Sequence, residues 1–289
     1  MDTNIWNILC DQSADPKRLM SSLADRDAAL VLSPHCWYEL AKTFRSTKAS
    51  AEQRDQKLFG YINEFLKAGV LCNKDNAQLF QSEVLAARSG RLSVDPAIDS
   101  TARSLVCELT HELMNGRVSR ILEVFTDAQT QRASNLRNRE ASHLHGRADH
   151  KALLQSVAEN DLDHLMQAVL TGSSGVALIV QEIKAHFPEA DAKGMRDCAT
   201  ALLSSPVGRF AKGFVRSVVY YSWRCAHRNS NRSDLADDMY HVLNASYCDT
   251  YVSAELNQQE YAPIILGPDI RIMIYDNTKP ADEFLLELA

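Results

Sequence analysis

The apolar residues of this 289-residue chain change their spacing along its length, and this change constrains the fold more than any other feature. Between about residues 51 and 205 they recur with the 3.6-residue period of an amphipathic helix, as at Leu58 and Ile62. Towards both ends they instead form short runs of strand length. We therefore expect an α/β protein whose sheet is built from residues 1–50 and 206–289, with residues 51–205 as an all-helical insertion.

The strand-length runs have recognisable boundaries. The run Ala28–Leu32 is followed by Ser33 and Pro34, which favour the start of a helix as N-cap and N1 residues. Two further runs, Thr250–Ser253 and Ile270–Tyr275, follow near the C-terminus. Functional residues of an open parallel sheet gather beyond the carboxyl ends of its strands, so we expect the site where the two terminal segments meet.

Composition excludes several classes of protein. The chain has 11 Gly and 8 Pro and a formal net charge of −6, and it has no apolar run near the ~20 residues that a membrane span needs. Its seven cysteines stand singly, which favours reduced thiols and a cytoplasmic location. Because the chain is acidic, any contact with nucleic acid must come from a local basic surface.

Acidic residues stand near the predicted ends of strands and starts of helices. Asp2 precedes an apolar segment, Glu39 lies on the helix after the first strand-length run, and Asp238 lies at the start of a later helix. Asp249 and Glu255 flank a predicted strand. Carboxylates gathered in one crevice repel each other unless a cation lies between them, and Mg²⁺ or Mn²⁺ suits a site made of oxygen ligands.

The motifs that contain these acids resemble those of PIN-domain nucleases. They are Asp2-Thr-Asn-Ile-Trp, the segment from Ser33 to Glu39-Leu40, and Asp238-Met-Tyr-His241 leading to Tyr247-Cys-Asp249-Thr-Tyr-Val-Ser253-Ala-Glu255. The resemblance covers roughly residues 1–50 and 225–289. It implies a three-layer α/β/α fold with a central parallel sheet, and the activity of a divalent-metal-dependent ribonuclease.

The resemblance also implies roles for single residues, carried over by position. The implied catalytic residues and ligands of Mg²⁺ or Mn²⁺ are Asp2, Glu39, Asp238 and Glu255, with Asp249 as a further acid of the metal site. Asn4 and Ser253 lie within the same motifs and are expected to contact RNA.

A basic segment enters the last part of the chain. Six cations and no acid occur between residues 209 and 232, with aromatic residues between them. The cations expected to bind RNA are Arg216, Arg224, Arg228 and Arg232. Helical spacing places them along a stripe that can follow a phosphate backbone while the aromatic rings stack on bases. The alternative is that the rings form a core face and the cations a solvated one.

Two functions remain open from the sequence. The first is a ribonuclease of the kind found in toxin or defence systems, with RNA as its substrate, a surface for an antitoxin or another protein on the insertion, and a homodimer as one assembly. The second is a PIN module that binds RNA or protein without cleavage, because only Met1 precedes Asp2 and Glu255 stands where the pattern has Asp. A nuclease of the flap type is less favoured. A zinc site at His143, His145 and His150 is also disfavoured, because no fourth ligand accompanies them.

Overall fold

The protein is described from a computed structural model. It covers residues 1–41, 49–94, 98–117, 119–120, 122–124, 127, 130, 134, 154–228 and 233–289. The helices of the N-terminal part are α1 (Thr3–Asp11), α2 (Pro16–Ala24), α3 (Pro34–Ala41), α4 (Ala49–Lys67), α5 (Asn76–Arg88) and α6 (Ser100–Met114). The later helices are a 3₁₀ turn (Glu159–Asp161), α9 (Leu162–Thr171), α10 (Ser173–His186), α11 (Ala192–Ser204), α12 (Arg209–Arg228), α13 (Ser233–Leu243), α14 (Gln258–Leu266) and α15 (Ala281–Leu288). The strands are β1 (Val31–Leu32), β2 (Leu71–Cys72), β3 (Thr250–Ser253) and β4 (Arg271–Ile274).

The small amount of sheet corrects the predicted fold. Of the residues that the structure describes, 68% are helical, and the described strands form two separate two-stranded parallel sheets, β1–β2 and β3–β4. The prediction of a three-layer α/β/α fold with a central parallel sheet is therefore wrong. Strand-forming residues favour a local extended segment, whereas a central sheet needs several longer strands side by side, and these strands are only two to four residues long.

The predicted start of α3 and the predicted strands near the C-terminus agree with the structure, unlike the predicted central sheet. The helix α3 begins at Pro34, and the Ser33 hydroxyl accepts a hydrogen bond from the backbone N–H of Cys36 at 3.0 Å, as an N-cap serine does. Strand β3 has the predicted bounds, and β4 lies inside the predicted run. Strand β2 was not expected, because it lies within the segment predicted to be all-helical.

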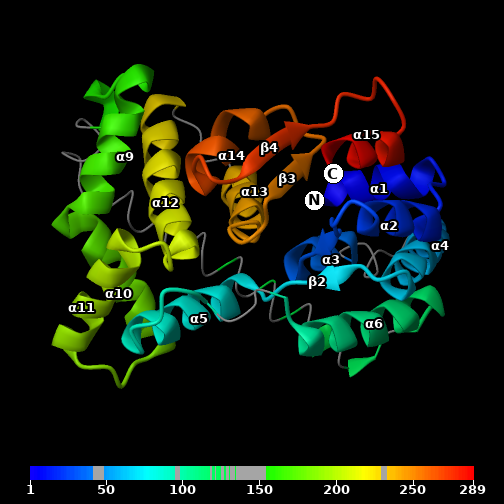
Figure 1. Ribbon diagram of the computed structural model, residues 1–289, viewed down its shortest axis with the longest axis horizontal. Coiled ribbons are helices and arrows are strands. Elements are labelled where there is room, and N and C mark those ends of the chain that lie inside the picture. Colours follow the sequence, from blue (N-terminus) through cyan, green and yellow to red (C-terminus); the bar gives the residue numbers. More distant parts are fainter. Residues whose placement is uncertain are drawn as a thin grey trace.

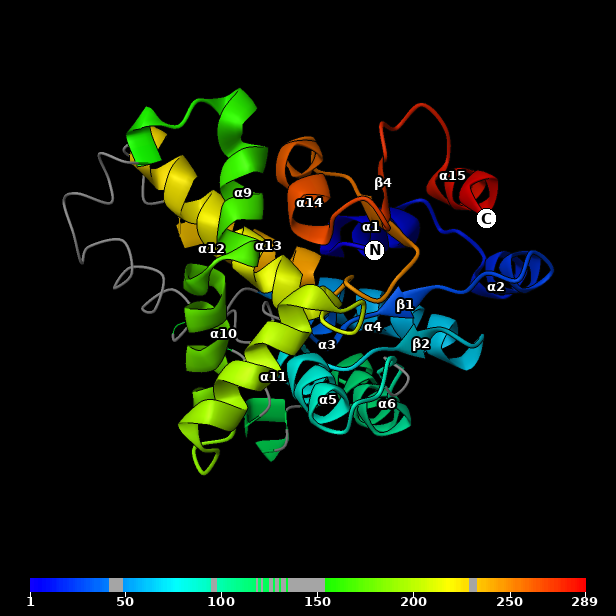
Figure 2. The same cartoon turned by 60° about the vertical axis from the view of Figure 1, so that its left-hand side comes forward.

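Strand β3 lies between two hydrophobic cores. Tyr251 packs into a core built mainly by α5 and α9–α14, while Val252 packs into a core built mainly by α1–α4, α6 and α15. Adjacent residues of a strand point to opposite faces, so one short strand contributes to both cores. Figure 1 shows β3, β4, α13 and α14 between the helices α9–α12 and the helices α1–α4, and in the turned view of Figure 2 helix α1 overlaps β4.

The segment of residues 51–205 contributes to both cores. Its helix α4 packs with the N-terminal helices, whereas its helices α9–α11 pack with α12. A division of the chain at residues 50 and 205 stays a prediction.

Two further observations concern the cysteines and the length of the described helices. All seven cysteines are free thiols. Among the helices that the structure describes, none has both the length and the apolar character required to cross a bilayer.

Candidate metal and catalytic site

Asp2 is buried and fixed at the end of β3. Its Oδ1 accepts hydrogen bonds from the backbone N–H groups of Asn4 (2.7 Å) and Ile5 (3.1 Å), so it caps the N-terminus of α1. Its Oδ2 accepts from the Ser253 hydroxyl and from the backbone N–H of Ala254 at 3.1 Å. The Asp2 backbone N–H also donates to the carbonyl oxygen of Val252 at 2.9 Å. Four donors therefore occupy a carboxylate that has about four acceptor positions.

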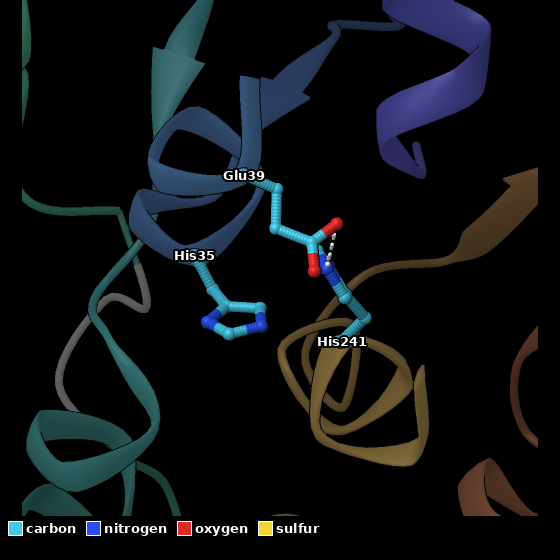
Figure 3. Close-up of side chains that lie close together, drawn as sticks. All are labelled: His35, Glu39 and His241. Carbon is cyan, nitrogen blue, oxygen red and sulfur yellow. Dashed lines mark ion pairs between the residues drawn. The ribbon is translucent and has the colours of Figure 1, made fainter. Parts of the chain in front are cut away.

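Glu39 faces α1 and α13 from the middle of α3. Its Oε2 lies 2.7 Å from Nε2 of His241 and accepts a hydrogen bond from the Thr3 hydroxyl at 3.1 Å. His35 stands one turn earlier on α3, and its ring centroid lies 4.1 Å from that of His241. Figure 3 shows the three side chains pointing toward one another from the two helices.

Glu255 follows β3 and is oriented by two amide side chains. Its Oε1 accepts from Nδ2 of Asn4 at 2.7 Å, and its Oε2 accepts from Nε2 of Gln258 at 3.2 Å. Each oxygen keeps a further lone pair for another ligand. Asn4, expected to contact RNA, therefore positions a carboxylate in this structure, and Ser253 does the same for Asp2.

Electrostatic effects show that the acidic residues share one region. Burial raises the pKa of Tyr261 far above its ordinary value, and the carboxylates of Asp238, Glu255 and Asp2 raise it further. Burial likewise raises the pKa of the Cys36 thiol to about 12, against the lowering effect of the N-terminal ammonium, and the carboxylates of Asp2 and Glu39 add to the rise. Three of the predicted acids, Asp238, Glu255 and Asp2, therefore influence the pKa of the same buried phenol, and Asp2 and Glu39 both influence that of the Cys36 thiol.

Two buried asparagines fix the end of α13 that carries His241. Nδ2 of Asn76 donates to the carbonyl oxygen of Tyr240 at 3.0 Å, and Nδ2 of Asn73 donates to that of Asn244 at 2.8 Å. Carbonyl groups near a helix C-terminus lack a full set of partners within the helix, and the two asparagines supply donors to them; the Tyr240 carbonyl also accepts from Nδ2 of Asn244 at 3.2 Å. The end of α13 that carries His241 is therefore tied to Asn73, which follows β2, and to Asn76, the first residue of α5.

Asp249 lies apart from the other predicted acids. It directly precedes β3, whereas Ser253, which contacts Asp2, is the last residue of that strand. Four residues of strand correspond to about 13 Å. The Asp249 backbone carbonyl accepts a hydrogen bond from Arg271, and the residue is exposed.

The basic segment forms α12, and its aromatic residues belong to the core. Phe210, Tyr220, Tyr221 and Trp223 are buried, so these rings are not available to stack on bases. Arg224 forms an ion pair with Glu260 of α14. Arg216 is partly buried, and its guanidinium lies close to the backbone of Gly267: a Cβ added to Gly267 would be 2.5 Å from Nη1 of Arg216. The side chain of Arg228 and the whole of Arg232 lie outside the described residues.

One group of three potential metal ligands occurs among the residues whose placement is described. It consists of His35, Glu39 and His241, whose ligand atoms all lie within 4.8 Å of one another. The sequence analysis selected Glu39 alone from this group. The spacing of His35 and Glu39, four residues apart on a predicted helix, was a signal that could have added His35. The histidines His143, His145 and His150 fall outside the described part of the chain.

No protein-family model, curated protein or solved structure matches the chain. The case for a function therefore rests on the residues of the site and on the resemblance of the short motifs.

Proposed function

We propose that the chain is a divalent-metal-dependent ribonuclease, in which Glu39, Asp238 and Glu255 hold Mg²⁺ or Mn²⁺ and Asp2 positions the surrounding backbone. The observation that carries this proposal is that the first residues of the chain join three of the acids: Asp2 is held by Ser253 at the end of β3, Thr3 donates to Glu39, and Asn4 donates to Glu255. Carboxylates are costly to gather unless a cation neutralises them. The motif resemblance to PIN-domain nucleases supports the choice of RNA as substrate.

The donor set fits a hard divalent ion. Glu255 keeps lone pairs on both oxygens, and Glu39 is partly exposed, so each can reach an ion at the surface of the site. The Tyr261 hydroxyl is buried and has no hydrogen-bond partner among the described residues, which leaves a polar atom facing the acids. Glu39, Asp238 and Glu255 would hold the ion, which would lower the pKa of a bound water and stabilise negative charge on the departing oxygen of a phosphodiester.

The chain's own residues prepare this site through hydrogen bonds. Ser253 and the backbone N–H of Ala254 hold Asp2, which in turn caps α1. Helix α1 presents Asn4 to Glu255 and Thr3 to Glu39. A single helix N-terminus therefore orients two of the proposed ligands, and such outer contacts commonly tune metal affinity by about 10- to 100-fold.

A second function is favoured by one observation. The Asp2 carboxylate already accepts four hydrogen bonds, and Glu39 already contacts His241. Acids that are satisfied within the protein fit a module that binds RNA or a protein without cutting. The free cysteines suit a cytoplasmic location for either function.

The test is cleavage of a mixed RNA pool with Mn²⁺ or Mg²⁺, with an EDTA control, by the wild-type protein and by Asp238→Asn. We expect metal-dependent cleavage that falls by about 100-fold or more in Asp238→Asn, because a direct ligand matters at least as much as an outer contact. The matched control is Asp197→Asn, an exposed acid on α11, which should cleave like the wild type.

Three results separate the alternatives. Cleavage that persists in EDTA or in Asp238→Asn would contradict the proposed site. A folded protein that binds RNA equally in EDTA and Mn²⁺ without cutting it would support the binding module. Loss of cleavage in Asp197→Asn as well would point to a general loss of folding.

A further inference from the structure

His35, Glu39 and His241 form a group whose chemistry differs from that of the acidic cluster. The ligand atoms of the three side chains lie within 4.8 Å of one another, and Nε2 of His241 is 2.7 Å from Oε2 of Glu39 (Figure 3). Two imidazole nitrogens and one carboxylate oxygen make a mixed donor set. Such sets are typical of Zn²⁺, Co²⁺, Fe²⁺ or Mn²⁺, whereas Mg²⁺ prefers oxygen ligands and keeps several waters.

The burial of the group is graded. His35 and His241 are 4% and 8% exposed, while the side chain of Glu39 is 25% exposed. The two imidazoles therefore lie on the protein side and the carboxylate on the solvent side. A site with three protein ligands and one open side has the arrangement of catalytic metal sites, in which water or substrate takes the remaining position.

Two elements hold the ligands at fixed positions. His35 and Glu39 share one face of α3, and α3 is anchored by its N-cap, Ser33. His241 is held by the hydrogen bonds that Asn73 and Asn76 make to the end of α13. Metal–ligand bonds of about 2.0–2.2 Å require ligand atoms roughly 3–3.5 Å apart. The 2.7 Å contact between Glu39 and His241 must therefore open by less than about 1 Å, and a pair at the 4.8 Å limit must close by a little more than about 1 Å, which are shifts that side-chain rotations can supply.

We propose that His35, Glu39 and His241 bind one transition-metal ion of the Zn²⁺ and Co²⁺ class, with an open coordination position beside Glu39. This site goes beyond the proposed nuclease, because it would bind the ion even in a protein that cuts no RNA. Glu39 belongs to both donor sets, so an ion in the histidine site lies next to the acidic cluster. The competing explanation is an ion pair between His241 and Glu39 that only stabilises the contact of α3 with α13.

The experiment is a titration of the chelator-treated 289-residue chain with Co²⁺. Binding is followed by the visible absorption that Co²⁺ shows when protein ligands replace its water. We expect binding of one Co²⁺ per chain, displacement of that Co²⁺ by Zn²⁺ but not by Mg²⁺, and a rise in melting temperature with added metal. In His35→Gln and His241→Gln the affinity should fall by about 100-fold or more. The matched control is His164→Gln, an exposed histidine on α9, which should bind Co²⁺ like the wild type.

A further variant and a check of folding keep the test decisive if a buried substitution impairs folding. Glu39→Gln changes a partly exposed side chain and should also weaken Co²⁺ binding, and circular dichroism checks the fold of each variant. A wild-type protein that binds neither Co²⁺ nor Zn²⁺ would overturn the proposal without any variant. Binding that survives in folded His35→Gln and His241→Gln, or that depends only on Asp238 and Glu255, would overturn it as well.

The readout separates this proposal from the proposed nuclease. If Co²⁺ binding depends on the two histidines and the protein cleaves no RNA, the histidine site is supported and the proposed nuclease activity is contradicted. If the wild-type protein binds no Co²⁺ and Mn²⁺-dependent cleavage is unchanged in folded His241→Gln, the nuclease is supported and the histidine site is contradicted.

Discussion

A buried carboxylate that is not among the proposed metal ligands gives the most quantitative prediction. Glu83 of α5 is completely buried and accepts hydrogen bonds from the backbone N–H groups of Phe210 (2.6 Å) and Ala211 (2.9 Å) at the start of α12. It also accepts one from the Tyr247 hydroxyl at 2.5 Å. These three donors favour the charged form of Glu83, but burial outweighs them and raises its pKa from 4.5 to about 7.

The shift fixes the sign and size of a pH effect on stability. Between the ordinary pKa of 4.5 and the folded-state pKa of about 7, the folded protein holds a proton that the unfolded chain has released. The contribution of Glu83 to the free energy of unfolding must therefore fall as the pH rises through this window. One pKa unit corresponds to about 1.4 kcal/mol, so the loss from this group amounts to about 3 kcal/mol.

The assay is urea unfolding at several pH values between 4.5 and 8, for the wild type and for Glu83→Gln. Because the variant carries no titratable group at this position, its stability relative to the wild type should rise by about 3 kcal/mol across the window. The exposed Glu108→Gln on α6 is the matched control and should show no such change. If wild type and Glu83→Gln keep a constant difference at every pH, burial does not raise the pKa of Glu83 and the argument fails.

Two further predictions concern buried contacts and backbone strain. Ser253→Ala removes a hydroxyl donor from the buried Asp2 carboxylate and should lower the free energy of unfolding by about 1–3 kcal/mol. The control, Ser104→Ala on an exposed face of α6, should change it little. Equal free energies for the two variants in urea titrations would rule out a structural role for the Ser253 contact. Gly267→Ala should lower the free energy of unfolding more than Gly90→Ala, by about 1 kcal/mol or more. Both residues have positive φ, but Gly267 combines φ of +79° with ψ of −175°, a conformation essentially restricted to glycine, and the flexible end of Arg216 would also have to move away from the new Cβ. Equal melting temperatures for the two variants would contradict this reasoning.

Local elements were predictable from sequence because their signals are local. A serine and a proline fix the start of α3, and a run of β-branched and aromatic residues fixes β3. The missed strand β2 also had a local signal. It follows Gly69, which has φ of +108°, so the helix before it must end there, and the apolar pair Leu71 and Cys72 comes directly after.

The arrangement of the strands was not predictable in the same way. Whether two strand-length runs pair depends on residues far apart in the sequence, and no periodicity reports on such pairing. Leu71 donates to the carbonyl oxygen of Leu30, forty-one positions earlier, and this contact joins β1 to β2 rather than to β3. Apolar runs at both ends of the chain therefore predicted strands correctly but a central sheet wrongly.

The candidate site shows the same division between local and distant information. The motifs selected Glu39, and the structure places it beside a histidine of α13 that the sequence analysis noted only as a neighbour of Asp238. A contact between α3 and α13 spans about two hundred residues, so the combination of His35 and Glu39 with His241 becomes visible only in the folded chain. The placement of Asp249 at the opposite end of β3 is likewise a consequence of strand length, which the motif alone does not give.

The position of the site between the two cores links its geometry to their packing. His35 and Glu39 belong to α3, whose apolar residues Cys36 and Trp37 pack into the core of α1–α4. His241 belongs to α13, whose residues Met239 and Val242 pack into the other core. The distance between the ligands therefore depends on how the two cores meet along β3. A substitution that shifts one core against the other would change the 2.7 Å contact of His241 with Glu39 even if both cores stayed well packed. Such a substitution should therefore change the metal affinity more than it changes the free energy of unfolding.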